Sequence, residues 1–511
     1  MRWIKSITIY AKGVFSKFRN LLHVNWRLYL PVSVYILFFS AFTILKNYTF
    51  LTSGLDLGVY NQALWTARFE GKLFYGTADL PFNPSGTFAG SFFGTHFSPA
   101  MFLLLPFYSI YPGVEILLII QSVILALGAI PLYWMARDKL GQNTALLISL
   151  LYLSYPALHY VNINDFHIEA LTSTFFLFAV YYLERKEWAK FFTFNILAMS
   201  TIEFAPVIAL FVGIYGLWLY SRGAFEGHRN ALRYIALTML IATLWFILAL
   251  KMKDFFNPYT NPVPFTWAHL FSNPASIFYY AFQNLDSKIS YLIGFLGPLV
   301  FLPLFAPAPL LMALPWIGAG FISNFYGYYG IYYQYSAFVI PFVFIAFVKA
   351  IERLASNGFS YNNMKKLFIV VFLSTIIFGV YLPVAPGSPW IYQLPVPNER
   401  TALLHNMLAL IPSDASVLTD TDIFPHVSSR SNAYLYITTS LLKQTPIDYV
   451  LTDTNSIWSS WTAPILPGDK ISPMMFARKG LESGEYGILA SAKGILLLKK
   501  DYAGEPVISV P

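Results

Sequence analysis

Acidic and histidine side chains stand at the ends of several apolar runs in the first 203 residues of the chain. They are Asp56, His96, Asp165, His167, Glu169 and Glu203. A carboxylate or an imidazole can take a proton from a hydroxyl group, and carboxylates can also hold a cation. Ionisable groups near membrane depth are costly, so each of these residues is a candidate for a functional role.

Each candidate also has a structural interpretation. Asp56 precedes a predicted helix that starts near Tyr60, and Asp is a favoured N-cap residue. Asp165, in NDFHIEA, is placed to cap the following helix in the same way, and an isolated His is more often structural than catalytic. Glu203 is harder to explain structurally, because it separates two apolar runs and Pro206 follows it.

A divalent metal bound by Asp56, Asp165 and His167 is a further alternative. The spacing of these residues is no tight metal signature. Asp165 and Glu169 are four residues apart and share a face if a helix begins there, in which case His167 points elsewhere. The sequence therefore requires no cofactor, and it leaves a divalent metal open.

The elements that must position these residues follow from composition. Of 511 residues, 57% are hydrophobic and only 11% are charged, against about 25% charged in ordinary soluble domains. We therefore predict a polytopic α-helical membrane protein with about eleven transmembrane helices. The predicted spans are 28–48, 114–136, 142–160, 168–184, 188–202, 204–221, 231–250, 290–306, 308–325, 334–350 and 367–385. The run 98–111 is short and contains two prolines, so we predict a re-entrant or interfacial segment.

The basic residues predict an orientation. The first 27 residues carry six Lys and Arg and no long apolar core, which indicates a cytoplasmic leader and not a cleaved signal peptide. With the N-terminus cytoplasmic, most basic residues of residues 1–390 fall on the inner side, as the positive-inside rule requires. The long loops 49–113 and 251–289 are then outside, and the chain is a multi-pass protein of the cell membrane.

Residues 391–511 are predicted to form a small extracytoplasmic α/β domain. The runs SVLTDT, IDYVLTD and YGILASAKGILLLKK are typical of strands, and NERTALLHNMLALIP is typical of an amphipathic helix. IFPHVSSR holds His426 and Arg430, either in a surface loop or in a loop that closes over a site. The chain has no cysteine, and its net charge of +8 lies in short clusters between apolar runs, so it does not indicate nucleic-acid binding.

Several stretches resemble a family of uncharacterised predicted membrane proteins of archaea and bacteria. In chain order they are LDLGVYNQALW, GTHFSPAMFLLLPFYSIYP, YPALHYVNINDFHIEA, LPLFAPAPLLMALPW, QYSAFVIPF and SVLTDTDIFPHVSSR. That family in turn resembles the GT-C glycosyltransferases, which include protein O-mannosyltransferases and the aminoarabinose transferases of lipid A. The shared layout is many spans, a long first outer loop with an acidic residue after the first span, and often a soluble domain at the end.

The resemblance implies that a sugar moves from a polyprenyl-phosphate donor to the hydroxyl of a glycan, lipid or protein acceptor on the outer face of the membrane. Asp56 stands where the family has its acceptor-activating acid, and Asp165, His167 and Glu203 are expected to complete the catalytic group. One departure is that Ile202 precedes Glu203, where the family commonly has Lys. Expected phosphate contacts are Lys251, Lys253, Lys288 and His96, with Arg68 and Lys72 in reserve. Expected acceptor or lid residues are Glu169, His426 and Arg430.

Three other functions compete with this interpretation. A transporter or lipid flippase also uses buried charges, but usually near the membrane midplane, whereas these residues gather at one end of the spans. Another membrane transferase, such as an acyltransferase with a histidine base, lacks a recognisable nucleophile here. A receptor-like protein that works through residues 391–511 would not explain the acidic groups near the membrane surface.

Overall fold

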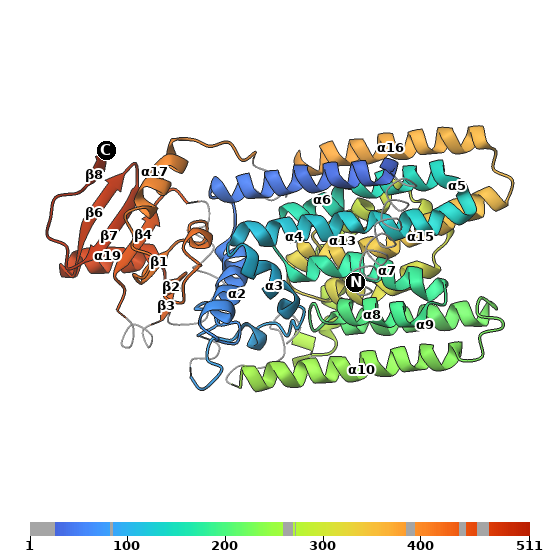
Figure 1. The fold of residues 1–511 in the computed structure, drawn as a ribbon, viewed down its shortest axis with the longest axis horizontal. Coiled ribbons are helices and arrows are strands. Elements are labelled where there is room, and N and C mark those ends of the chain that lie inside the picture. The colour runs from blue at the N-terminus through green and yellow to red at the C-terminus, as the bar shows by residue number, and fades with distance from the viewer. Residues whose placement is uncertain are drawn as a thin grey trace, which may run out of the picture.

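The computed structural model describes residues 26–81, 85–258, 269, 270, 272–384, 394–438, 446–456 and 470–510. The basic leader and parts of the loop 251–289 lie outside these residues. A bundle of helices runs along the longest axis, with a sheet at one end (Figure 1). The bundle helices are Trp26–Tyr48, α4 (Val114–Leu127), α5 (Ala129–Leu153), α6 (Pro156–Ile163), α7 (Thr172–Glu184), α8 (Trp188–Met199), α9 (Ala205–Ser221), α10 (Ala231–Phe256), α13 (Leu285–Leu296), α14 (Leu314–Phe321), α15 (Ile340–Ser356) and α16 (Tyr361–Val384).

The helical membrane character is confirmed, whereas the number of spans is not. Among the described residues, 4 helical stretches are long and apolar enough to cross a membrane. They are Trp26–Tyr48, Val114–Leu153, Ala231–Phe256 and Tyr361–Leu382. The second of these reverses at Gly141, whose φ is 78°, and Ser149 Oγ on the returning arm donates to the carbonyl of Ala129, 3.1 Å away. The two arms therefore correspond to the predicted spans 114–136 and 142–160.

The predicted spans 290–306 and 308–325 are the most strongly interrupted by irregular backbone. Within the predicted span 290–306, α13 ends at Leu296 and 3₁₀ turns follow it. Within the predicted span 308–325, another 3₁₀ turn is followed by the short helix α14. The physical reason is proline, which lacks an amide hydrogen and disrupts the turn before it. Five prolines fall in this stretch, namely Pro298, Pro303, Pro307, Pro309 and Pro315.

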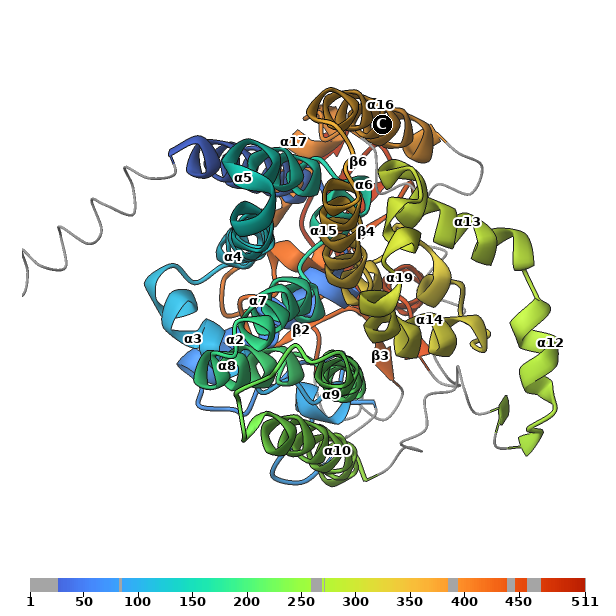
Figure 2. The same cartoon turned by 90° about the vertical axis from the view of Figure 1, so that its right-hand side faces the viewer.

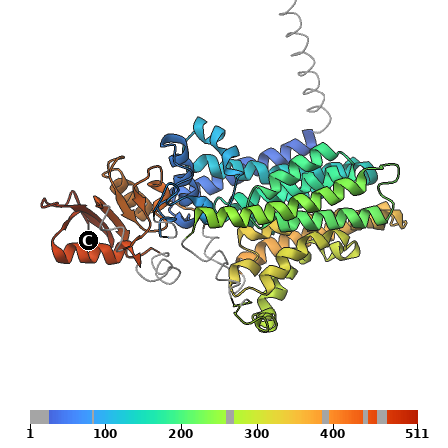
Figure 3. The same cartoon turned by 90° about the horizontal axis from the view of Figure 1, so that it is seen from below.

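The loop after the first helix forms a compact layer between bundle and sheet. It contains a turn of π-helix at Gly54–Gly58, α2 (Val59–Phe69) and α3 (Met101–Ile110) (Figure 1). The segment predicted to be re-entrant is thus mostly the short helix α3. Figure 2 looks along the bundle and shows α12 (Ser276–Phe282) standing apart from it, as does Figure 3. None of the side chains of α12 is buried, and Phe278, Tyr279 and Phe282 are highly exposed, as suits a helix at a membrane interface.

The C-terminal sheet region is confirmed. Six strands pair in the order β2-β1-β4-β7-β6-β8, with β1 parallel to both β2 and β4. The strands are β1 (Val417–Thr419), β2 (Ala433–Tyr434), β4 (Tyr449–Asp453), β6 (Tyr486–Ala492), β7 (Ile495–Lys500) and β8 (Ile508–Val510). A second pair joins β3 (Ile437–Thr438) to β5 (Lys470–Ile471), and α17 (Glu399–Leu408) and α19 (Pro473–Ser483) accompany the sheet.

The loop 49–113 and the C-terminal domain share one hydrophobic core. Phe50 and Leu57 from the loop belong to the same buried cluster as Phe424 and Leu451 from the domain. Polar contacts cross the boundary as well: Asn61 Nδ2 donates to Ser428 Oγ at 2.8 Å, and the two residues are 367 positions apart. The turn that carries Asp56 is therefore fixed from both sides.

Replacing Gly54 with Ala is expected to destabilise this junction. A Cβ at Gly54 would lie 2.6 Å from Leu435 Cδ2 and 2.8 Å from the Thr421 carbonyl oxygen, so the domain must shift. Overpacking of this kind costs roughly 1–3 kcal/mol. Thermal unfolding and limited proteolysis of the full chain measure the effect. Gly318→Ala is the matched control, because nothing lies within 4 Å of its added Cβ, and equal behaviour of the two variants would contradict the prediction.

Candidate active site

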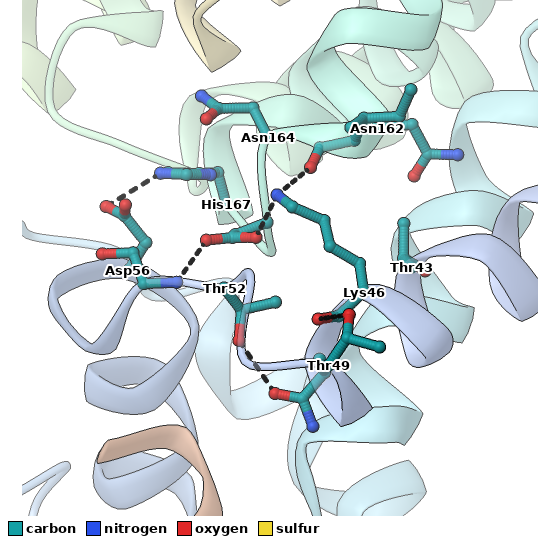
Figure 4. A network of polar contacts seen from close by, with 12 residues as sticks. Thr43, Lys46, Thr49, Thr52, Asp56, Asn162, Asn164 and His167 are labelled. Atoms are coloured by element: carbon teal, nitrogen blue, oxygen red, sulfur yellow. Dashed lines mark hydrogen bonds and ion pairs between the residues drawn. The ribbon is translucent and has the colours of Figure 1, made fainter. Parts of the chain in front are cut away.

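The centre of the site is a pair formed by Asp56 and His167. Asp56 lies in the turn Gly54–Gly58, and His167 lies in the link between α6 and α7. Asp56 Oδ1 and His167 Nε2 are 3.1 Å apart, as drawn in Figure 4. The aspartate side chain is 38% exposed whereas the histidine side chain is only 4% exposed. The carboxylate therefore has access to a substrate, and the imidazole supports it from behind.

Asp165 holds these two segments together. Its Oδ2 accepts the amide hydrogen of Ser53 at 2.7 Å, and its Oδ1 pairs with Lys46 Nζ at 2.9 Å (Figure 4). Lys46 also donates to the Ile163 carbonyl at 2.8 Å. Asp165 has φ of 56°, a conformation that Asp tolerates better than most residues. Both its oxygens are occupied by protein groups, so its observed contacts position the turn of Asp56.

Lys46 is a residue of the site that the sequence analysis missed. It lies within the predicted first span, 28–48, and was not among the candidate residues. The signal that marks it is position: it falls in the last turn of an apolar helix, ten residues before Asp56, where an unpaired ammonium would be costly. Its side chain is 2% exposed.

Two polar groups from neighbouring helices complete the support. Gln121 in α4 accepts the His167 amide hydrogen at 2.9 Å and donates to the Asp165 carbonyl at 2.6 Å, which fixes the strained link. Tyr60 in α2 donates to Glu169 Oε2 at 3.2 Å. Glu169 is buried, and this contact ties it to α2.

A second charged group surrounds Glu203 in the link between α8 and α9. Glu203 Oε1 lies 2.7 Å from Lys253 Nζ and 3.2 Å from His96 Nδ1. Lys253 comes from the last turn of α10. Glu203 thus has a lysine neighbour from another helix, whereas Ile202 stands directly before it in the chain. Among the described residues, Glu203 Oε2 is buried without a hydrogen-bond partner.

Aromatic rings connect the two charged groups. Tyr60 contacts both His167 and Phe92, with ring centroids 6.4 and 4.9 Å apart, and Phe92 lies 5.9 Å from His96. A chain of ring contacts from His167 through Tyr60 and Phe92 to His96 therefore links the Asp56–His167 pair to the group around Glu203.

The charges of the central pair are set by their neighbours. Burial alone would lower the pKa of His167, but the Asp56 carboxylate, with Glu169 and Asp165, raises it to about 9. Burial opposes ionisation of Asp56, and the charge and hydrogen bond of His167 outweigh it, so the pKa of Asp56 is lowered. At neutral pH the pair is an aspartate beside an imidazolium.

The stability of the protein should therefore depend on pH through His167. A histidine whose pKa rises on folding contributes stability that is complete below its unfolded pKa of about 6.5 and is lost as the pH rises through about 9. We expect the difference in melting temperature between wild type and His167→Gln to be largest near pH 6 and to shrink above pH 9. The exposed His228→Gln is the control, and a pH-independent difference for His167→Gln would contradict the assignment.

The remaining predicted residues lie outside this cluster. Lys251 is 76% exposed and faces Asp254 at 4.0 Å. Lys288 is buried and donates to the backbone carbonyls of Tyr280 and Phe321. The other four make these contacts: His426 Nε2 with the Asn47 carbonyl, Arg430 Nη1 with the Pro412 carbonyl, Arg68 Nε with Ser109 Oγ, and Lys72 Nζ with Glu70.

A metal at Asp56, Asp165 and His167 remains a prediction. The described part of the chain contains no group of three or more His, Asp or Glu placed to hold a metal ion.

His426 and Arg430 bind backbone groups at the base of the C-terminal domain, where burial lowers the pKa of His426 to about 3. In the structure these two side chains thus anchor the domain.

Comparison with known proteins places the chain in a family. Residues 46–497 match the model of a family described as "Predicted membrane protein (DUF2079)". The chain belongs to the DUF2079 family. This membership confirms the resemblance to a family of predicted membrane proteins. The matched region runs from Lys46 to Leu497 in β7, so it includes both charged groups of the site. No curated protein matches this DUF2079 chain.

Solved structures similar to this DUF2079 protein have the GT-C fold. ArnT from Cupriavidus metallidurans bound to undecaprenyl phosphate has a TM-score of 0.52 at 12% identity, with 91% of this chain and 98% of that chain covered. Its apo state gives 0.50 at 11% identity, with the same coverage. The archaeal oligosaccharyltransferase AglB from Archaeoglobus fulgidus, in complex with an inhibitory peptide and a dolichol-phosphate, gives 0.45 at 11%, covering 84% and 70%. The GT-C-like fold is thus confirmed through ArnT.

Proposed function

We propose that this protein transfers a sugar from a polyprenyl-phosphate-linked donor to an acceptor hydroxyl at the outer face of the cell membrane. The single observation that carries the proposal is the half-exposed Asp56 carboxylate, held by a buried His167 beside the Glu203–Lys253–His96 group. The ArnT structure supports the donor class, because it has the same fold and holds undecaprenyl phosphate.

The transfer needs a base for the acceptor and a cation for the leaving group. Asp56 takes the proton of the acceptor hydroxyl. The acceptor oxygen bonds to the anomeric carbon while the bond from that carbon to the phosphate oxygen breaks, and polyprenyl phosphate leaves with the electron pair. Lys253 and His96 supply an ammonium and an imidazole that contact Glu203 in the second charged group, so we assign the phosphate to them.

Glu203 has a defined part in this scheme. It pairs with Lys253 and His96 in the structure, and these two neighbours hold its pKa well below its usual range in spite of burial. A phosphate that binds Lys253 would share the ammonium with Glu203. Glu169 and Tyr60 border the same region and are proposed to orient the acceptor, while the acceptor itself is a glycan, a lipid or a protein. Residues 1–390 form the membrane domain in this scheme, and residues 391–511 form the extracytoplasmic one.

Binding of a short-chain polyprenyl phosphate to the purified protein tests the donor assignment. Lys253→Met should weaken binding about tenfold, because a charge-assisted hydrogen bond to phosphate is lost. Lys251→Met is the matched control. It removes the same positive charge two positions away in the chain, and the Lys251 side chain is exposed. Equal effects of the two variants, or no binding by the wild type, would reject the assignment and favour a transporter.

A further inference from the structure

A cavity lies at the end of the bundle opposite to Asp56. Its volume is about 770 Å³, within the range of ligand sites. Trp218 and Leu219 from the end of α9 form part of its wall, with Lys349 and Arg353 from α15 and the segment 306–311. The proposed reaction makes no use of this cavity.

The position of the cavity follows from the helices that reach it. Helix α9 begins two residues after Glu203 and ends one residue before Arg222, which lines the cavity. Its 17 residues span about 26 Å at 1.5 Å per residue. Lys139, another lining residue, stands just before the reversal at Gly141. The cavity is therefore separated from the candidate active site by the length of the bundle.

The charges around the cavity do not cancel. Lys349 Nζ lies 2.5 Å from Glu184, and Lys139 Nζ lies 3.1 Å from Glu352, so each lysine has a carboxylate. Arg222 and Arg353 have no carboxylate partner among the described residues. Arg353 Nη1 donates to the Phe305 carbonyl at 3.1 Å, and the guanidinium of Arg222 lies over the Trp218 ring. Two positive charges thus remain for an anion.

Irregular backbone forms one wall of the cavity. Between α13 and α14 the chain has no α-helix, and Val300 and Phe301 have φ values of 51° and 55°. At membrane depth such backbone is tolerated where it is buried in protein or lines a cavity. The Pro-rich segment 306–311 does the latter. Prolines that interrupt the predicted spans therefore open a space beside the two arginines.

We propose that this cavity binds the phosphate headgroup of a membrane lipid. Guanidinium groups form strong paired hydrogen bonds with phosphate, and basic pockets between membrane helices hold anionic headgroups. Trp218, Phe225 and Leu311 supply the apolar surface that the upper part of the lipid chains contacts. Under the orientation proposed above, this lipid belongs to the cytoplasmic leaflet.

Native mass spectrometry of the full-length protein in detergent tests the site. Dioleoyl phosphatidic acid is the probe, dioleoyl phosphatidylcholine is the zwitterionic comparison, and inorganic phosphate is the lipid-free comparison. The double variant Arg222→Gln/Arg353→Gln should lose affinity for phosphatidic acid by about tenfold or more. Arg229→Gln/Arg233→Gln is the matched control, because these arginines lie at the same end of the bundle but do not line the cavity.

The outcomes separate the alternatives. A loss in the cavity variant alone, with little phosphatidylcholine bound by either protein, supports the proposal. Equal losses in both variants would show general attraction of the basic surface and overturn it. Binding of inorganic phosphate that phosphatidic acid does not displace would assign the cavity to a free anion, which also overturns it. Neither double variant should affect polyprenyl phosphate binding at Lys253. Failure of the lipid-site proposal is therefore distinguishable from failure of the proposed function.

Discussion

Replacing Asp56 with Asn is expected to lower the rate of sugar transfer about a thousandfold, because general base catalysis contributes roughly a hundredfold to ten-thousandfold. The amide keeps the size of the carboxylate but cannot accept a proton. Initial rates with a saturating polyprenyl-phosphate-linked sugar and an acceptor that the wild type uses measure the effect. Donor affinity should change little, since the phosphate is assigned to Lys253 and His96, away from the carboxylate.

Two further variants make this result interpretable. Asp254→Asn removes a carboxylate that faces Lys251 outside the cluster and should leave the rate unchanged. His167→Gln removes the charge that lowers the pKa of Asp56, so the acid limb of its pH–rate profile should move to higher pH. A folded Asp56→Asn protein with full activity would remove Asp56 from the mechanism.

Replacing Arg400 with Leu is expected to destabilise the C-terminal domain by about 3 kcal/mol, as loss of one partner does in buried ion pairs. Arg400 in α17 donates from Nε to Asp453 at 2.5 Å and from Nη2 to Asp422 at 2.7 Å. Both aspartate side chains are 1% exposed, so neither can turn to water. Chemical unfolding of the full-length protein, followed by proteolysis of the domain, measures the loss.

The pH dependence of this variant gives an independent check. Burial raises the pKa of Asp422 while Arg400 opposes that rise, so without Arg400 the carboxyl accepts a proton at higher pH. The variant should therefore recover part of its stability as the pH is lowered and the carboxyl becomes neutral. Arg478→Leu is the control: its pair with Glu482 is exposed at 80% and 62%, and exposed pairs contribute at most about 1 kcal/mol. Equal destabilisation by both variants would contradict the assigned role of Arg400.

Apolar helices without proline were predictable from sequence. The predicted span 231–250 corresponds to α10, and 28–48 corresponds to the helix Trp26–Tyr48, because an uninterrupted apolar run that long has few other structures available in a membrane. The stretch 290–325 is equally apolar, so hydropathy alone predicts two spans there. Its prolines interrupt the helices, because each proline removes a backbone hydrogen bond at its own position. A hydropathy average over many residues does not register such a local effect.

The sequence identified which residues are candidates for the site, but it did not predict how they pair. Topology brought Asp56, His167 and Glu203 to one end of the bundle, and the structure has them there. Which carboxylate pairs with which cation depends on how the helices pack. Glu203 obtains its lysine from Lys253, fifty positions away, and Asp165 obtains Lys46, 119 positions away. No spacing rule encodes contacts at these separations, and only an unpaired charge near membrane depth hints that a partner exists.

The core shared by the loop 49–113 and the C-terminal domain also bears on how the protein is made. Contacts such as that of Asn61 with Ser428 join residues 367 positions apart, so the turn of Asp56 lacks its packing against the C-terminal domain until nearly the whole chain has been synthesised. During that time the polar groups of the loop remain exposed. Nascent chains that stop short of the sheet should therefore be open to proteases at this loop.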